Sequence, residues 1–243
     1  MRANYDYNFG DYNDLPAVNI NEPHCLVLII ADCSGSMNGL AIENLMKSIN
    51  RFKADVCSDP KAAKRLDVAV LGFNHDTNVV QGWRPITQME PVHFVADGGT
   101  NLNKALLEGV EMLRSRGHYY EDQDIELRLP MMVLISDGYG GDISEAAALI
   151  KQRTADKKMQ LWALGAKGYD KETMAKLTDG KRVFELVDED GYDFHEFFQV
   201  IAEVSKKRST SAPGEKIKID SPAGQVDKGS NCRVPNFDEW LNE

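Results

Sequence analysis

Short apolar runs recur along the chain, and polar or glycine-containing segments bound each of them. The first of these runs, CLVLIIA, occupies positions 25–31 and is the longest. Runs of roughly four to eight residues that are apolar at successive positions are typical of strands buried on both faces of a sheet. The pattern predicts such strands at 24–31, 67–73, 131–135, 161–164 and 183–187.

Between these strands, apolar residues recur at steps of three and four positions, the spacing of a helix with one apolar face. The pattern predicts amphipathic helices over 42–52, 102–113, 143–150 and 194–204. The segment 77–86 follows the strand at 67–73 too closely for a helical crossover. We therefore expect it to pair antiparallel at an edge of the sheet.

Together these elements alternate in the order β-α-β-β-α-β-α-β-α-β-α. Such alternation predicts an α/β fold, with a doubly wound, mostly parallel, Rossmann-like sheet of six strands flanked by helices and one antiparallel edge strand. The folded domain is expected at 23–210. Residues 1–22 and 211–243 have no such periodicity, and they predict an N-terminal arm and a C-terminal extension.

Composition narrows the classes of partner. The chain has 243 residues and 42% hydrophobic content, enough for one substantial core. With 38 acidic against 28 basic residues it carries a formal charge of −10, which argues against nucleic acid or a membrane surface as partner. The absence of an apolar span or signal segment from the sequence predicts a cytoplasmic protein. Four scattered cysteines without a CxxC pair predict reduced thiols.

Polar side chains follow three of the predicted strands. DCSGSM at 32–37 supplies Asp32, Ser34 and Ser36, VADGGTNL supplies Thr100, and LISDGYGGD supplies Asp137. Because ligands of doubly wound sheets gather outside the carboxyl ends of the strands, we expect these five side chains to meet at one edge. Taken singly, the serines and Thr100 have another explanation as helix caps, and SDG as an ordinary turn.

Two carboxylates and three hydroxyls form a hard-oxygen environment that suits a small divalent cation and is poorly suited to zinc or copper. We expect Mg²⁺, or alternatively Mn²⁺, with the neutral hydroxyls of Ser34, Ser36 and Thr100 on the metal. Some of the contact with the carboxylates would pass through water. This arrangement would leave one coordination position open to a carboxylate from another molecule. Without metal, Asp32 and Asp137 would be close like charges, so the pKa of one carboxyl should rise.

DCSGSM, the threonine of DGGTNL and the aspartate of ISDG resemble the metal-ion-dependent adhesion site of von Willebrand factor type A (vWA) domains, and the resemblance extends over about 24–205. It implies a sheet order of 3-2-1-4-5-6 with the third strand antiparallel. It also implies a non-catalytic protein-binding module, in which an Asp or Glu of a protein partner completes the coordination of the metal.

A narrower resemblance is to the stand-alone bacterial vWA proteins of the tellurium-resistance and stress-associated branch. It depends on MNGLAIENLMKSIN, LPMMVLISDGYGGD and the phenylalanine-rich segment that begins FHEFFQVIAEV. In that branch such domains often accompany a kinase and a phosphatase encoded elsewhere, so the resemblance implies a stress-response role.

Two alternatives remain open. A strand ending in DCS is similar to phosphoaspartate hydrolases, and a metal-dependent phosphohydrolase would use Asp32 as nucleophile, but its second aspartate is replaced here by Ser34. The last ten residues, VPNFDEWLNE, place aromatic residues among acids. They either dock on the domain itself, are bound by another protein, or reach the metal of a neighbouring copy and give self-association through the C-terminal arm.

Overall fold

The computed structural model describes residues 14–166, 168–178, 180–186, 192–211 and 231–235. Its centre is a seven-stranded sheet in the order β3-β2-β1-β4-β5-β6-β7. The strands are β1 (Cys25–Asp32), β2 (Leu66–Phe73), β3 (Thr77–Pro85), β4 (Met131–Ser136), β5 (Gln160–Gly165), β6 (Val183–Leu186) and β7 (Cys232–Arg233). All neighbouring strands pair parallel except β3 and β7, which lie antiparallel at the two edges.

The predicted fold class, the six predicted strands and the antiparallel edge are confirmed. The predicted strand number is wrong by one, because β7 adds a seventh strand next to β6. This strand is only two residues long and belongs to the segment expected as a C-terminal extension. Two residues are too few to form an alternating pattern, so hydrophobic periodicity could not reveal them.

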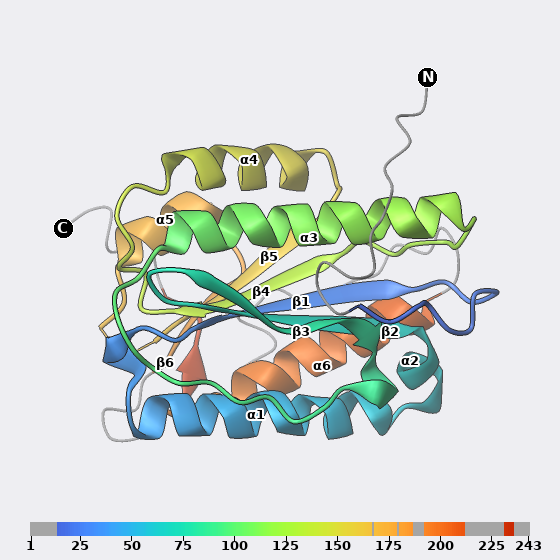
Figure 1. Cartoon of the computed structure of the whole chain (residues 1–243), viewed down its shortest axis with the longest axis horizontal. Coiled ribbons are helices and arrows are strands. Elements are labelled where there is room, and N and C mark those ends of the chain that lie inside the picture. Colours follow the sequence, from blue (N-terminus) through green and yellow to red (C-terminus); the bar gives the residue numbers. More distant parts are fainter. Residues whose placement is uncertain (1–13, 167, 179, 187–191, 212–230, 236–243) are drawn as a thin grey trace.

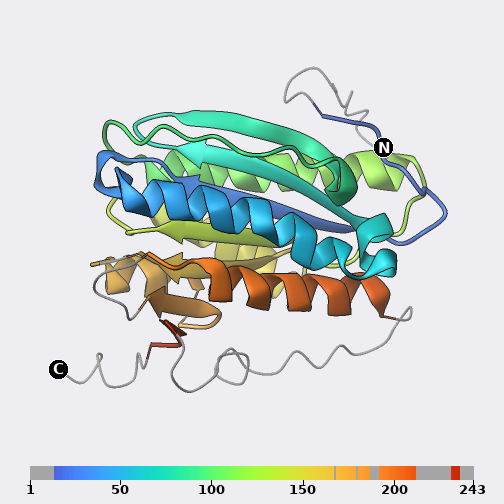
Figure 2. The same cartoon turned by 90° about the horizontal axis from the view of Figure 1, so that it is seen from below.

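Helices cover both faces of the sheet (Figure 1). One face carries α1 (Leu40–Cys57), α2 (Pro60–Arg65) and α6 (His195–Thr210), and Figure 2 shows α1 and α6 running side by side. The other face carries α3 (Leu102–Asp122), α4 (Ser144–Ala155) and α5 (Lys171–Thr178). The short helix α2 was not expected; Asp59 caps it by accepting hydrogen bonds from the backbone of Lys61 and Ala62. None of the helices described is long and apolar enough to cross a membrane.

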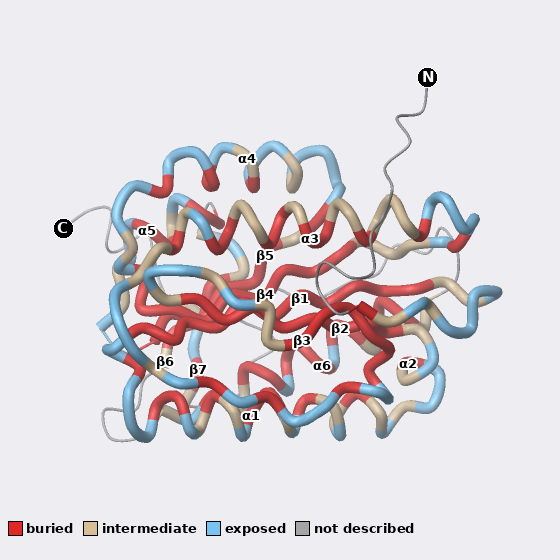
Figure 3. Tube along the Cα trace, viewed as in Figure 1, coloured by how far each residue is buried: buried red, intermediate tan, exposed pale blue. Residues whose placement is uncertain are grey.

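The alternation of side chains along β1 divides the core into two halves. Val27 and Ile29 pack with α1 and α6, whereas Leu28 and Ile30 pack with α3. Buried positions are therefore concentrated in the strands and on the inward faces of the helices (Figure 3). A continuous apolar strand is explained by this arrangement, since both of its faces are covered.

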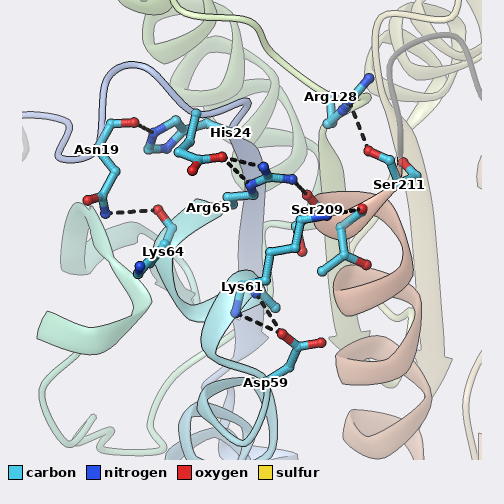
Figure 4. A network of polar contacts seen from close by, with 12 residues as sticks. Asn19, His24, Asp59, Lys61, Lys64, Arg65, Arg128, Ser209 and Ser211 are labelled. Carbon is cyan, nitrogen blue, oxygen red and sulfur yellow. Dashed lines mark hydrogen bonds and ion pairs between the residues drawn. The ribbon is translucent and has the colours of Figure 1, made fainter.

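A polar network closes the sheet edge at which the parallel strands begin (Figure 4). The Arg65 guanidinium contacts the Glu22 carboxylate and donates a hydrogen bond of 2.9 Å to the carbonyl oxygen of Ser209. Arg128 donates to the carbonyl oxygen of Ser211 at 3.1 Å. Residues from the start of the chain, α2 and the end of α6 are thus joined at this edge, and the opposite edge carries the predicted site.

Candidate metal centre

Asp32, the last residue of β1, has both carboxylate oxygens engaged. Oδ1 accepts a hydrogen bond of 2.9 Å from the backbone nitrogen of Ser34, and Oδ2 accepts one of 2.7 Å from the hydroxyl of Ser136. The residue is 0% exposed. A fully buried carboxylate therefore lies at the end of the central strand, and both of these donors are neutral.

A chain of oxygen atoms leads from this strand end to the surface. The Oγ atoms of Ser34 and Ser36 are 2.9 Å apart, and Ser36 Oγ donates to Asp137 Oδ2 at 2.6 Å. Asp137 Oδ1 accepts from the backbone nitrogen of Tyr139 at 3.1 Å. Ser34 and Asp137 are buried, whereas Ser36 is exposed. The site is consequently reached from solvent through Ser36.

The loop that carries Thr100 is fixed to the end of β1 by backbone hydrogen bonds. Asp97 donates to the carbonyl oxygen of Cys33 at 2.9 Å, and Gly35 donates to that of Gly98 at 3.0 Å. Gly98 has φ +73°, and a Cβ there would lie 2.8 Å from His75 Nδ1, so the turn needs a glycine. Thr100 follows at the same edge and is half-buried.

The third loop lies against the second. A Cβ added to Gly140 would lie 2.5 Å from Cβ of Leu102, the first residue of α3. Such a contact is too short for any side chain, so the β4–α4 loop can approach α3 only because this residue is glycine. The three loops that follow β1, β3 and β4 are thereby packed against one another.

The capping explanations do not hold in the structure. Asn101, not Thr100, caps α3, since its side chain accepts from the backbone nitrogen of Lys104 at 3.2 Å. The N-cap of α1 is Gly39, and Ser36 lies before it in the 3₁₀ turn Gly35–Met37. The hydroxyls of Ser36 and Thr100 are therefore not required to begin a helix.

The electrostatics of the site are unfavourable for the ionised form of Asp32. Burial raises the pKa of the Asp32 carboxyl, and the charge of Asp137 adds a smaller contribution in the same direction. The hydrogen bonds from Ser34 and Ser136 oppose this rise. The expected increase is present, but desolvation rather than like-charge repulsion is its leading cause. Burial and the charge of Asp32 likewise raise the pKa of the Cys33 thiol to about 12.

Direct hydrogen bonds join four of the five predicted residues, Asp32, Ser34, Ser36 and Asp137, whereas Thr100 is placed by its backbone. The sequence analysis missed Ser136, although it directly precedes Asp137; a buried hydroxyl at a strand end needs a partner, which is the signal that could have identified it. Among the residues described, no three His, Cys, Asp or Glu side chains are grouped to hold a metal. A metal here would depend on hydroxyl oxygens.

Comparisons with known proteins agree with this architecture. The family model of the von Willebrand factor type A domain matches residues 27–200. Among solved structures, a von Willebrand factor type A protein from Catenulispora acidiphila is similar, with TM-score 0.56 and 15% identity over 76% of this chain and 43% of that one. The pilus adhesin SpaC of Lactobacillus rhamnosus GG gives TM-score 0.59 and 16% identity over 76% of this chain and 30% of that one.

A third similar structure is BatB from Bacteroides thetaiotaomicron, with TM-score 0.50 and 17% identity over 77% of this chain and 100% of that one. At these identities the structures establish the fold alone, and the chain spans less than half the length of the first two. No curated protein matches the chain. The family match covers well over half of the chain, which therefore belongs to the von Willebrand factor type A domain family, whose members are generally metal-dependent protein-interaction modules.

Proposed function

We propose that the chain binds one Mg²⁺ or Mn²⁺ through Asp32, Ser34, Ser36, Thr100 and Asp137, and that the ion binds an acidic residue of a protein partner. The single observation that carries this proposal is the line of hydrogen-bonded oxygens from Ser34 through Ser36 to Asp137, which crosses from one loop to another. Oxygen atoms brought this close without a cation among them are arranged as a set of metal ligands would be.

The donor set fits such an ion. Adjacent oxygens in octahedral coordination at about 2.0–2.1 Å from Mg²⁺ are separated by about 2.9 Å. The Oγ atoms of Ser34 and Ser36 have this separation, 2.9 Å. In this proposal the hydroxyls of Ser34, Ser36 and Thr100 bind the ion, while Asp32 and Asp137 orient the loops and supply negative charge, in part through water.

When bound, the ion would supply a positive charge with a coordination position open to a carboxylate. The chain itself contributes the orientation of that position. Ser136 and the backbone of Ser34 hold the Asp32 carboxylate, and Tyr139 holds that of Asp137, so both negative groups are fixed before any partner arrives. Pre-ordered ligands reduce the entropy lost on binding, which favours a selective interaction.

The cellular setting is the less constrained part of the proposal. The narrower resemblance supports a cytoplasmic stress-response or tellurium-resistance system with a kinase or phosphatase as partner. An alternative donor of the carboxylate is the acidic end of a second copy. That end, 236–243, lies outside the described residues, and its sequence alone motivates the alternative.

A phosphohydrolase that uses Asp32 is disfavoured. A nucleophile must reach its substrate, but Asp32 is 0% exposed and both of its oxygens accept hydrogen bonds. The position two residues later, where such enzymes carry their general acid, holds Ser34. Phosphate release that requires Mg²⁺ and is lost in Asp32→Asn would reverse this conclusion.

The proposal is tested by thermal unfolding and by affinity capture, each with Mg²⁺, with Mn²⁺ and with chelator. Wild type should melt higher with metal, and Thr100→Ala should lose most of that increase and retain no metal-dependent partner. Thr87→Ala is the matched control, since Thr87 is exposed on the 3₁₀ turn Ile86–Gln88, outside the three loops. A melting temperature that metal does not change would contradict the metal site, and identical captured proteins in all samples would contradict its role in binding.

A further inference from the structure

Large apolar side chains lie exposed around the candidate metal centre. Leu40, Val95 and Tyr139 are 63%, 83% and 59% exposed, respectively. Each belongs to a different loop of the site: Leu40 follows Ser36, Val95 precedes Thr100, and Tyr139 follows Asp137. Only two other large apolar residues of the described chain are comparably exposed, Val18 and Ile20, and these lie before β1 at the opposite edge.

A pocket opens directly beside the metal loops. It has a volume of about 270 Å³, and its lining includes Cys33, which precedes the ligand residue Ser34. Val80, Phe94 and Val95 supply apolar walls, and Asn74 and Asn78 supply polar ones. At about 30 Å³ for each water, the pocket has the volume of about nine water molecules. One large side chain of a bound molecule fits this space.

Single exposed apolar residues are ordinary, but a group of them beside a polar centre indicates an interaction surface. Acidic residues in the same loops are already engaged. Asp76 pairs with Lys104 at 2.5 Å, Asp97 accepts from the backbone nitrogen of Gly98 at 2.7 Å, and Asp142 accepts from that of Ser144 at 2.9 Å. The rim therefore offers apolar contacts to a ligand more readily than it offers acidic partners to a basic one.

We propose that the metal edge recognises a segment of a protein partner in which the metal-bound Asp or Glu is flanked by bulky apolar residues, one of which fills the pocket. This inference rests on the proposed function and specifies its partner. The metal would account for the carboxylate, and the loops around Leu40, Val95 and Tyr139 account for its neighbours. Because Cys33 and Ser34 are adjacent, the residue in the pocket lies within about two positions of the acid, at roughly 3.3 Å per residue of extended chain.

The chemistry of this partner follows from the charge of the chain. At −10, the protein repels an acidic segment as a whole, so attraction must be local. One divalent cation attracts one carboxylate, and the burial of apolar surface is insensitive to charge. An acidic segment with basic or small polar flanks would leave Val95 and Tyr139 in contact with water.

The test is a selection from a displayed peptide library with three random residues on each side of a fixed Asp or Glu, performed with Mg²⁺ and with chelator. Wild type should enrich, with Mg²⁺ only, peptides that carry an aromatic residue, Leu or Met within two positions of the acid. The best peptide should then bind the double variant Val95→Ser, Tyr139→Ser about tenfold or more weakly, because each buried methylene contributes about 0.8 kcal/mol. Ile20→Ser is the matched control, with an exposed apolar residue outside the site.

The outcomes separate this inference from the proposed function. Enrichment that requires Mg²⁺ but shows basic flanks or no flank preference would overturn the inference and leave the metal-dependent binding intact. Equal binding by the double variant and by Ile20→Ser would do the same. A library that yields no Mg²⁺-dependent peptide would overturn both. A selected motif that matches NFDEW would support the inference and identify a second copy as the partner.

Discussion

The two edges of the sheet each contain a buried carboxylate, on neighbouring strands. Asp32 ends β1 at one edge, and Asp67 lies near the start of β2 at the other; both residues are 0% exposed. Their surroundings differ in the source of compensation for the negative charge. At Asp67 the chain supplies a histidine, whereas the hydrogen bonds to Asp32 come from a hydroxyl and a backbone amide.

Asp67 forms a closed network. Its Oδ2 lies 2.5 Å from His24 Nδ1 and accepts a hydrogen bond of 2.7 Å from the Tyr120 hydroxyl. The Arg116 guanidinium stacks over the Tyr120 ring at 5.1 Å from its centroid. Burial, followed by the charge of Asp67, raises the pKa of Tyr120, which therefore remains a hydrogen-bond donor. This network needs no external partner.

Asp32 forms an open counterpart. A buried carboxylate without a cation destabilises the fold unless something else neutralises it. The raised pKa of Asp32 expresses this destabilisation. The comparison teaches that burial of charge alone does not mark a functional edge. The edge where compensation must come from outside the chain is the one suited to an external cation.

The largest expected effect is at the closed edge. Asp67→Ala should lower the free energy of unfolding by about 3–5 kcal/mol, because removal of one partner of a buried pair leaves the other uncompensated. Urea unfolding of wild type and variant measures this loss. Glu126→Ala, which removes a largely exposed partner of Arg128, is the control and should change stability by no more than about 1 kcal/mol. Similar losses in the two variants would show that the His24–Asp67 pair is not a stabilising element.

The second prediction compares one neutral donor at each edge. Ser136→Ala removes the hydroxyl that donates to Asp32 and accepts from the backbone of Gly138, whereas Tyr120→Phe removes the hydroxyl that donates to Asp67. Asp67 Oδ2 retains His24, but Asp32 Oδ2 loses its donor. In chelator, Ser136→Ala should cost about 1.5–3 kcal/mol and Tyr120→Phe about 1 kcal/mol.

Urea unfolding in chelator gives both values. A greater loss for Tyr120→Phe than for Ser136→Ala would mean that the closed edge depends on the tyrosine rather than on the histidine, and the contrast between the two carboxylates would weaken.

The two edges also differ in how far they could be predicted from sequence. The candidate site was found because its residues directly follow apolar strands, and strand order then brings the loops together. His24, Asp67 and Tyr120 are 43 and 53 positions apart, and each stands in a segment that resembles ordinary core or helix. Their meeting depends on the register between β1, β2 and α3, which periodicity does not define.

Exposure was equally hidden from the sequence. Val95 and Tyr139 are single apolar residues in polar loops, and such residues are as often buried under a loop as exposed on it. The packing of the three loops decides between these outcomes, and it depends on close approaches such as that of Gly140 to Leu102. Local pattern thus identified the ligand residues, while the surface around them required the three-dimensional structure.

The third prediction concerns a gain in stability. Asp32→Asn keeps the shape of the side chain and removes the buried charge, so the metal-free variant should melt higher than metal-free wild type. For a domain of this size each 1 kcal/mol gained raises the melting temperature by about 2–4 °C. The variant should also lose the response to Mg²⁺. Thermal scans with metal and with chelator measure both effects, and a metal-free variant that melts below wild type would contradict the open character of this edge.

The smallest expected effect is the pH dependence of that gain. Because the folded-state pKa of Asp32 is raised, its ionisation opposes folding above that pKa. As the pH falls through the raised pKa, wild type takes up the proton and this opposition disappears. The advantage of Asp32→Asn in chelator should therefore be full at neutral pH, decrease in acid, and vanish below the ordinary carboxyl pKa of 3.8.

Asp142 supplies a control of opposite sign. Hydrogen bonds from Ser144 lower the pKa of its carboxyl, so its ionised form favours folding, and this contribution is lost as the pH falls through the lowered pKa. Relative to wild type, Asp142→Asn should thus be less stable at neutral pH and should approach wild type in acid. The two variants should converge on wild type from opposite sides. If Asp32→Asn instead kept a constant advantage at every pH, the gain would come from packing and not from the removal of an uncompensated charge.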